Sequence, residues 1–586
     1  MDLHLKSEIR LLLCLILLYS VVSDSKRYDA YVVVKAGALR GKVTGHPPES
    51  PTMELQEFLG VPYASPPTGN RRFANPEPLE SWEGTHDARR YGPSCHQRIE
   101  KPKDGFSGIT MWNPPNQMDE DCLNLNIWTT QPRPQKAAVM VWIHGGAYET
   151  GTSALSIYDG KTLVGLNDII LVSINYRLGA FGFLATGDGR ISGNFGAMDQ
   201  IMALKWIKDN IAAFGGNPDS VTIFGESAGG TSIDYLMLSP LRGSLFTRAI
   251  LQSAASDSPL FYMRPEQAKK RSAIFFQRLN CTNDNRILNC LRQSRVSPRQ
   301  IIESQKVVSD FAFSWVPTVA KPFLPEKPDV LRNSVPYNKT RVLLGVTKDE
   351  ATYLLLNFTT SFSRDNTSNE QTAQDVRKII SVMNPDLSGD RRQAIYRHYM
   401  RGGSGDVKDL IRNRKISSDI VGDRYFVCPA VRLSDRIARA GQDVFLYYFA
   451  HRPVSEVWPS WMGAYHSIEI QFVFGLPVTF PDRYSNDDVM LSRRVMTYWT
   501  NFARFGNPND PELLEWPQYD EDTMSYMELN LACTVHTGGL RNDQCTFWNQ
   551  LRTSSSGSRF KSVCILGNVV TMLLYLFITQ SIIKMY

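Results

Sequence analysis

One short stretch constrains this chain more than any other. An apolar run at 221–224 (Val-Thr-Ile-Phe) leads at once into the sequence G-E-S-A-G at 225–229, and a helical stretch at 231–236 follows. A G-x-S-x-G sequence is common by chance, but its position between a strand and a helix is specific. Such a turn is too tight for side chains beside the serine, and it holds the hydroxyl above the sheet, where a base can reach it. The position predicts that Ser227 is a nucleophile.

The rest of the chain follows a strand–helix rhythm. Four further apolar runs, at 137–144, 169–174, 342–346 and 444–449, are typical of strands buried on both faces of a parallel sheet. Between them, apolar residues recur at helical spacing from Met198 to Ile211, and the pattern stops at Gly215. No internal stretch is biased enough to be a linker. We therefore expect one large α/β domain with a mostly parallel central sheet flanked by helices.

Composition excludes several classes of protein. Apolar residues make up 42% of the 586 residues and charged residues 21%, which excludes a disordered chain. The formal net charge is +6, and no long basic run occurs, so a nucleic-acid partner is not expected. No metal-ligand spacing is present, and neither a metal nor another cofactor is expected.

A nucleophilic serine needs a base, an acid that orients the base, and donors for the oxyanion. Where a serine lies in such a strand–turn–helix, the triad residues follow along the chain in the order serine, acid, histidine. The histidine must therefore come after Ser227, which leaves four candidates: His398, His451, His466 and His536. The acid is expected just after a later strand, where Asp349 and Glu350 both follow the run at 342–346. The oxyanion donors are expected in the glycine-rich turn at 144–147.

Both ends of the chain are typical of export signals. Residues 1–23 combine Lys6 and Arg10 with an apolar run at 11–19 and small residues, which predicts a secretory signal peptide. The alternative is an N-terminal membrane anchor, for which that run is too short. Residues 551–586 combine small residues, a polar spacer and an apolar end, which predicts a glycolipid (GPI) anchor signal, with a spanning helix as the alternative. Either reading places the body of the protein outside the cell.

Longer motifs resemble the cholinesterases of the type B carboxylesterase family, and most closely its acetylcholine-hydrolysing members. These motifs lie at 106–114, 120–128, 224–230, 348–350 and 457–463. The resemblance covers roughly residues 30–550 and implies an α/β-hydrolase fold with a deep active-site gorge, in a catalytic domain at 28–550. It implies a triad of Ser227, Glu350 rather than Asp349, and His466. The implied oxyanion donors are the N–H groups of Gly146, Ala147 and Ala228.

The resemblance also implies a pocket for a choline ester. Aromatic faces bind a quaternary ammonium, which cannot donate a hydrogen bond. The implied choline site comprises Trp112, Tyr353 and Glu226, and the implied acyl pocket comprises Phe311, Phe313 and Leu260. The expected reaction is hydrolysis of acetylcholine to choline and acetate through an acyl-enzyme, which limits cholinergic signalling. The expected place is the outer face of the cell membrane, including synapses.

Several residues depart from the family pattern. Leu260 stands where a tryptophan usually completes the acyl pocket, so propionyl or butyryl esters could enter. At the gorge rim, Arg98 and Glu149 stand at tyrosine positions and Glu100 replaces an aspartate; Leu354 and Asn357 also replace common aromatics. The sequence therefore leaves two alternatives open: a broader cholinesterase or carboxylesterase, and a non-catalytic cholinesterase-like adhesion protein.

The remaining expectations concern covalent features and assembly. By resemblance, the disulfides join Cys95 to Cys122, Cys281 to Cys290 and Cys428 to Cys545, which leaves Cys533 as a spare thiol. Candidate glycosylation sites are Asn280, Asn338, Asn357 and Asn366. The chain is also expected to form a homodimer.

Overall fold

The computed structural model describes residues 29–45, 53–101, 107–282, 286–293, 295–306, 313–334, 340–358, 362, 371–401 and 409–553. The chain divides into two compact units, Met1–Asn542 and Asp543–Tyr586. The described residues of the second unit, 543–553, all belong to helix α19 (Asn542–Thr553). The proposed signal at 1–23 and the tail from residue 554 lie outside the described residues.

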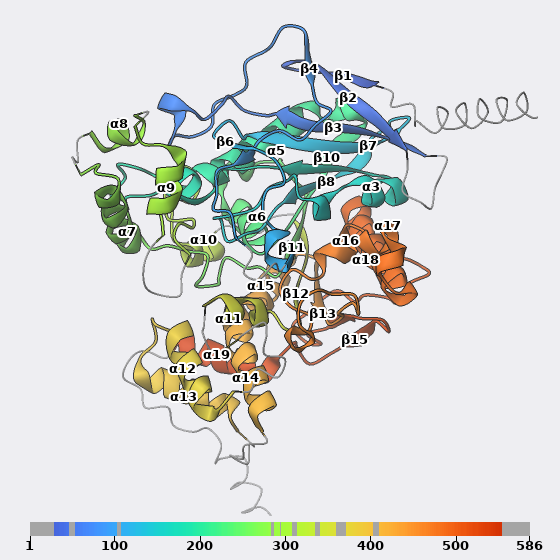
Figure 1. Ribbon diagram of the computed structural model, residues 1–586. Helices are drawn as coiled ribbons and strands as arrows, with labels where there is room; N and C mark the ends of the chain where they lie inside the picture. Colours follow the sequence, from blue (N-terminus) through green and yellow to red (C-terminus); the bar gives the residue numbers. More distant parts are fainter. Residues whose placement is uncertain are drawn as a thin grey trace, which may run out of the picture. The chain divides into compact units, whose positions relative to one another are not determined.

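A large mixed sheet forms the centre of the first unit (Figure 1). Its strand order is β1-β2-β3-β7-β9-β8-β10-β11-β12-β13-β14-β15, and β4 pairs with β2. The middle strands, from β9 to β14, run parallel, whereas both ends of the sheet are antiparallel. The strands are β1 (Asp29–Val34), β2 (Gly37–Gly45), β3 (Glu54–Pro62), β4 (Thr85–Asp87), β7 (Asn124–Gln131), β8 (Ala137–Ile143), β9 (Ile169–Ile174), β10 (Gly216–Glu226), β11 (Arg248–Gln252), β12 (Arg341–Thr347), β13 (Val444–Phe449), β14 (Tyr526–Leu529) and β15 (Thr534–His536); β5 (Ser94–Cys95) and β6 (Met118–Asp119) form a separate pair.

The five predicted strands are confirmed as β8, β9, β10, β12 and β13. Their continuous apolar character follows from burial on both faces: all six residues of β9 are buried. The antiparallel strands are additional to the prediction. In β1, buried and exposed residues alternate, so the strand lacks the continuous apolar run that marks a strand buried on both faces.

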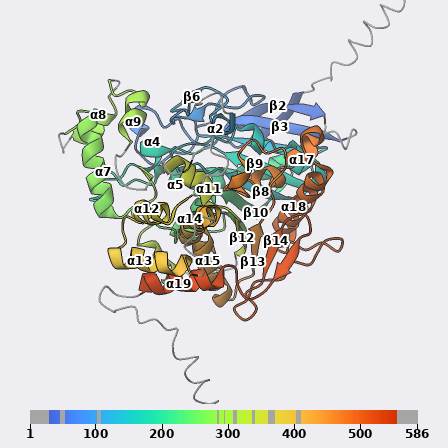
Figure 2. The ribbon, with the colours of Figure 1, turned by 60° about the horizontal axis from the view of Figure 1, so that its bottom comes forward.

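Helices alternate with the strands along the chain and cover the sheet. The predicted helix around Met198 is α5, which ends at Asn210 and continues as a short 3₁₀ turn before Gly215. The helices are α2 (Ser107–Thr110), α3 (Lys161–Asn167), α4 (Gly179–Phe183), α5 (Phe195–Asn210), α6 (Ala228–Leu238), α7 (Pro265–Arg278), α8 (Ile287–Leu291), α9 (Pro298–Ser304), α10 (Pro328–Ser334), α11 (Ala351–Phe358), α12 (Ala373–Met383), α13 (Gly389–Tyr399), α14 (Leu410–Gly422), α15 (Cys428–Arg439), α16 (Ile470–Val473), α17 (Leu476–Thr479), α18 (Asn486–Phe505) and α19. In Figure 2, α17 and α18 lie together beside the central strands, and α18 contacts β8 and β10.

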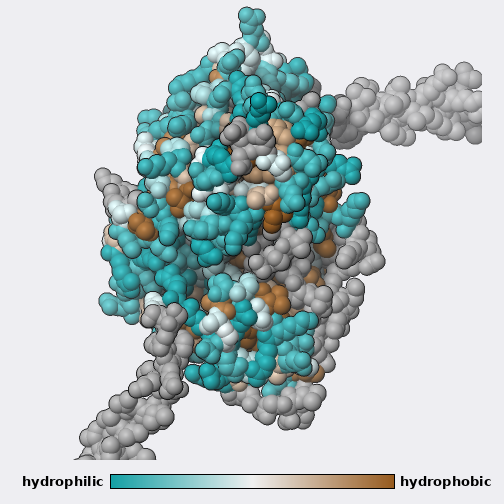
Figure 3. Space-filling view, turned by 90° about the vertical axis from the view of Figure 1, so that its left-hand side faces the viewer, coloured by the Kyte–Doolittle hydropathy of each residue, from teal (hydrophilic) through white to brown (hydrophobic). Residues whose placement is uncertain are grey.

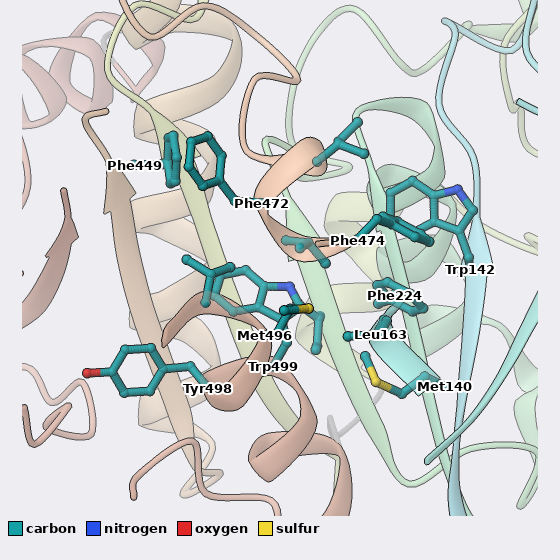
Figure 4. Close-up of a cluster of buried hydrophobic side chains, with 14 of the residues drawn as sticks. Met140, Trp142, Leu163, Phe224, Phe449, Phe472, Phe474, Met496, Tyr498 and Trp499 are labelled. Carbon is teal, nitrogen blue, oxygen red and sulfur yellow. The ribbon is translucent and has the colours of Figure 1, made fainter. Parts of the chain in front are cut away.

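Aromatic side chains fill the core between these helices and the sheet (Figure 4). Trp142 on β8 contacts the rings of Phe224 and Phe474, with centroids 4.9 and 5.1 Å apart. Met496 and Trp499 of α18 are buried in the same cluster. Because Phe224 lies three residues before Ser227, this packing fixes the strand from which Ser227 projects.

The surface in Figure 3 is mostly hydrophilic, with hydrophobic residues in small groups. Within the described part of the chain, no helix is both long and apolar enough to cross a bilayer.

Candidate active site

Ser227 lies in a strained turn between β10 and α6. Its backbone has φ 55° and ψ −121°, a conformation that is costly for a residue with a side chain. Gly225 and Gly229 make the turn possible: a Cβ at Gly229 would lie 1.9 Å from the carbonyl oxygen of Ile143, and one at Gly225 would lie 2.4 Å from it. The N–H of Ser227 donates to the carbonyl of Gln252 on the neighbouring strand, at 2.8 Å. This geometry is that of a nucleophile elbow.

His466 and Glu350 form a buried hydrogen-bonded pair. His466 Nδ1 donates to Glu350 Oε2 at 2.6 Å, and Glu350 Oε1 accepts from the N–H of Thr347 at 2.8 Å. Glu350 lies three residues after the end of β12 and is 2% exposed. Both carboxylate oxygens therefore have fixed donors, and the imidazole is held in one orientation.

Asp349, the other candidate acid, has a different partner. Its carboxylate accepts from the N–H of Ala464 at 3.0 Å, and its own N–H donates to the carbonyl of Ala464 at 2.9 Å. These bonds hold the loop that precedes His466. The two adjacent carboxylates thus have different roles. Glu350 contacts the imidazole, and Asp349 fixes the backbone of the loop that carries His466.

The other candidate histidines are engaged elsewhere. His451 contacts Asp488, which caps α18, and His536 lies 2.9 Å from Glu528 on β14. His398 stacks edge-on against Tyr399, with ring centroids 5.3 Å apart. Of the four candidates, the structure brings His466 to the acid that follows β12.

A second carboxylate touches the imidazole. Glu226 Oε1 lies 3.0 Å from His466 Nε2, the distance of an ion pair when the imidazole is protonated. The described residues show no hydrogen bond from the Ser227 hydroxyl to His466. Burial alone would lower the pKa of His466, but the charges of Glu226 and Glu350 outweigh it and raise that pKa well above 6.5. Both carboxylates therefore favour the imidazolium over the neutral ring.

This arrangement makes a prediction for pH dependence. A general base must be neutral, so a raised His466 pKa places the acidic limb of the kcat/KM profile at higher pH. Glu226→Gln removes one of the two charges that raise the pKa, and the acidic limb should move to lower pH. The profile is measured with an uncharged aryl ester, so that cation binding does not enter. Asp219→Asn, a surface carboxylate paired with Lys208, serves as the control; an unmoved limb in Glu226→Gln would contradict the assignment.

Sequence reasoning missed Glu469, which no motif distinguishes. Glu469 is fully buried; Oε1 accepts from Gln252 Nε2 at 3.0 Å, and Oε2 has no partner among the described residues. Burial, together with the charges of Glu226 and Glu350, raises the pKa of Glu469 to about 8. Glu469 is therefore mostly protonated at neutral pH.

A stability prediction follows for Glu469. Its pKa is raised on folding, so between pH 4.5 and about 8 the folded chain binds a proton that the unfolded chain releases, and stability falls as pH rises. The loss is on the order of a few kcal/mol. Glu469→Gln keeps an acceptor for Gln252 and removes the titration, so its thermal midpoint should fall less than the wild type's between pH 5 and 8. Parallel curves for the two proteins would refute this.

The turn at 144–147 lies against the serine. A Cβ at Gly145 would lie 2.7 Å from both the carbonyl oxygen and Oε2 of Glu226, and 3.2 Å from Ser227 Cβ. Gly146 and Ala147 have positive φ values of 106° and 59°. Among the described residues, neither N–H of this pair is taken up by a protein acceptor. Ala228 is the first residue of α6, where N–H groups lack intrahelical partners. All three amides can serve as oxyanion donors.

The candidate choline-site residues border the hydrophobic cluster. Trp112 and Tyr353 are both partly buried and pack against it, and the Tyr353 ring contacts Trp458 with centroids 5.5 Å apart. On the acyl side, Leu260 is buried, and Phe313 stacks on Phe261 at 5.7 Å. Phe311 lies outside the described residues.

The three residues expected at the gorge rim, Arg98, Glu100 and Glu149, all have polar partners. Arg98 and Glu100 form an exposed ion pair with each other. Glu149 accepts a hydrogen bond from the N–H of Ser314. Leu354 is buried, and the side chain of Asn357 lies outside the described part.

Two of the expected disulfides are confirmed: Cys95–Cys122 and Cys281–Cys290. Cys428 and Cys545 are each disulfide-bonded, and their pairing stays a prediction. Cys533 is a buried free cysteine, as expected. Asn280 is exposed, while Asn338 and Asn366 lie outside the described residues.

The fold and this arrangement define a class: the serine hydrolases of the α/β-hydrolase fold place a serine elbow beside a histidine–acid pair in this way. A model of the Carboxylesterase family matches residues 28–548, and the chain belongs to that family.

Curated relatives are similar over most of the chain. The chain is 39% identical over 554 residues to a protein named "Acetylcholinesterase" from Bungarus fasciatus, which spans 92% of this chain and 89% of the relative. It is 38% identical over 531 residues to "Cholinesterase" from Mus musculus, spanning 89% and 86%.

Proposed function

We propose that this carboxylesterase-family hydrolase is a cholinesterase whose preferred substrate is acetylcholine. The hydrogen bond between His466 and Glu350 beside the Ser227 elbow is the observation that carries the proposal. The names of the two relatives and the aromatic residues Trp112 and Tyr353 support the choline specificity.

In the proposed mechanism, Ser227 Oγ attacks the ester carbonyl while His466 Nε2 takes its proton. The N–H groups of Gly146, Ala147 and Ala228 bind the oxyanion. The tetrahedral intermediate collapses, the C–O bond to choline breaks, and His466 returns the proton to the leaving oxygen. Water then attacks the acyl-serine by the same route and releases acetate. Glu350 holds the imidazole and stabilises its cation throughout.

Glu226 gives substrate charge a direct effect on the base. In the free site, its charge favours protonated His466. A quaternary ammonium beside Glu226 would offset that charge and favour the neutral imidazole. The choline group thereby prepares the base that cleaves its own ester.

Trp112 provides the sharpest test of choline binding. Trp112→Ala removes a ring face worth about 2 kcal/mol to a desolvated cation, which corresponds to about thirtyfold in KM for acetylthiocholine. The KM for an uncharged ester should change far less. Trp461→Ala, at another partly buried tryptophan on the same cluster, controls for lost packing. Equal losses on charged and uncharged substrates in Trp112→Ala would make this ring structural.

Leu260 favours a second candidate, a cholinesterase with a wider acyl range. Its branched side chain is smaller than the tryptophan of the family pattern. Rates with acetyl-, propionyl- and butyrylthiocholine and an uncharged aryl ester decide between the candidates. A strong fall from acetyl to butyryl supports the narrow form, a flat series supports the wide one, and preference for the aryl ester supports a general carboxylesterase.

We also propose that the enzyme is exported and held at the outer face of the membrane by a glycolipid, as a homodimer. This proposal rests on the sequence of residues 1–23 and 551–586 and on the family resemblance.

A further inference from the structure

One peptide group on the acyl side is held by opposite charges at its two ends. It joins Phe313 to Ser314. Arg271 Nη1 donates to the carbonyl oxygen of Phe313 at 2.6 Å and to that of Ser314 at 3.0 Å. The N–H of Ser314 donates to Glu149 Oε1. The guanidinium thus binds the oxygen, and the carboxylate binds the hydrogen, of the same peptide group.

These charged groups come from separate parts of the fold. Arg271 lies on α7, and Glu149 follows β8 by six residues. All of the residues involved are partly buried. Hydrogen bonds to charged groups are about twice as strong as neutral ones, and partial burial reduces competition from water. The contact therefore fixes a segment that has no regular secondary structure of its own.

On the Glu149 side, the contact reaches the oxyanion turn. The N–H groups of Glu149 and Thr150 both donate to the carbonyl of Gly146, at 2.9 Å. The intervening Ala147 and Tyr148 have positive φ, so the turn depends on such bonds to keep its shape. A shift of Glu149 would displace the turn that carries the N–H groups of Gly146 and Ala147.

On the Phe313 side, the contact reaches the acyl pocket. The ring of Phe313 stacks on Phe261, and Phe261 lies edge-on to Phe426 at 6.5 Å. Phe426 in turn lies against the His466 ring, with centroids 4.7 Å apart. It belongs to a π-helical turn, Asp423–Val427, a feature that is frequent at functional sites. A chain of ring contacts therefore leads from Phe313 to the imidazole of the base.

We propose that Glu149 and Arg271 are specificity-determining positioning residues: by holding the Phe313–Ser314 peptide, they keep Phe313 where it limits the acyl group, and they tie this residue to the oxyanion turn. The inference rests on the proposed function and deepens it. It also gives a role to Glu149, which stands where the family pattern has an aromatic rim residue. A carboxylate there supplies a hydrogen-bond acceptor that a ring cannot.

The test is the ratio of kcat/KM for butyrylthiocholine to that for acetylthiocholine. Glu149→Ala should raise the ratio about tenfold and lower kcat for acetylthiocholine. Glu149→Gln keeps an acceptor oxygen and should stay within about twofold of the wild type in this ratio. Ser314→Ala keeps the N–H and should leave the ratio unchanged. The tenfold change corresponds to loss of the hydrogen bond to Ser314, and the twofold limit to its replacement by a bond to a neutral acceptor.

Arg271→Met provides a second route to the same result, should Glu149→Ala fail to fold. It should raise the ratio as well, and the double variant Glu149→Ala with Arg271→Met should raise it less than the product of the single effects, because both residues hold one peptide. An unchanged ratio in variants that fold, with only a lower thermal midpoint, would overturn the inference. Absence of thiocholine hydrolysis by the wild type would instead overturn the proposed function.

Discussion

Ser227→Ala is expected to lower kcat for acetylthiocholine by about 10⁴- to 10⁶-fold. The alanine removes the only atom that can form the acyl-enzyme, and the oxyanion donors then have no covalent intermediate to stabilise. Folding should be retained, because Ser227 holds its place through backbone contacts: its N–H bonds to Gln252 and its carbonyl accepts from Thr231.

The measurement compares purified, active-site-quantified protein. An organophosphonate fluorophore should label the wild type with one equivalent and leave Ser227→Ala unlabelled. Ser253→Ala is a matched control, since Ser253 is a buried serine with positive φ at the end of the neighbouring strand β11. Substantial turnover or stoichiometric labelling of Ser227→Ala would place the nucleophile elsewhere.

Glu350→Gln is expected to lower kcat about 10³- to 10⁴-fold with little change in KM. The amide can donate a hydrogen bond to Nδ1, which favours the wrong imidazole tautomer, and it cannot stabilise the imidazolium. Burial makes this loss large, because no water replaces the missing charge.

The neighbouring Asp349 supplies the control for Glu350. Asp349→Asn leaves the His466–Glu350 pair in place but weakens the bond to Ala464, so it should cost far less in kcat and more in thermal stability. If the two variants lost the same activity, the division of labour between these carboxylates would be wrong.

The elements that could be predicted from sequence are those with a strong local signal. Strands such as β9 are almost entirely apolar because they are buried on both faces. The elbow at Ser227 is marked in the sequence by Gly225 and Gly229, where a side chain would clash. The antiparallel strands give weaker signals, because one face of β1 meets solvent. Pairing across the sheet joins distant segments, which local pattern cannot indicate.

The candidate site likewise contains residues that sequence motifs identify and residues that no local pattern marks. The choice of His466 and Glu350 came from family motifs, whereas residue logic alone left four histidines and two acids. Nothing local marks Glu469, whose pKa is raised by its burial in the fold and by the charges of Glu226 and Glu350. Likewise, Glu149 was expected as a rim charge, and its bond to Ser314 depends on a contact across 165 residues of sequence.

The proposed function requires that this hydrolase recognise a cationic choline ester. It is tested most directly by kcat/KM for acetylthiocholine and for its uncharged isostere 3,3-dimethylbutyl thioacetate, measured side by side on the wild-type enzyme. We expect a preference for the cation of at least about tenfold, since the ring face of Trp112 and the charge of Glu226 act on the ammonium alone. Equal values, or a preference for the uncharged ester, would contradict it.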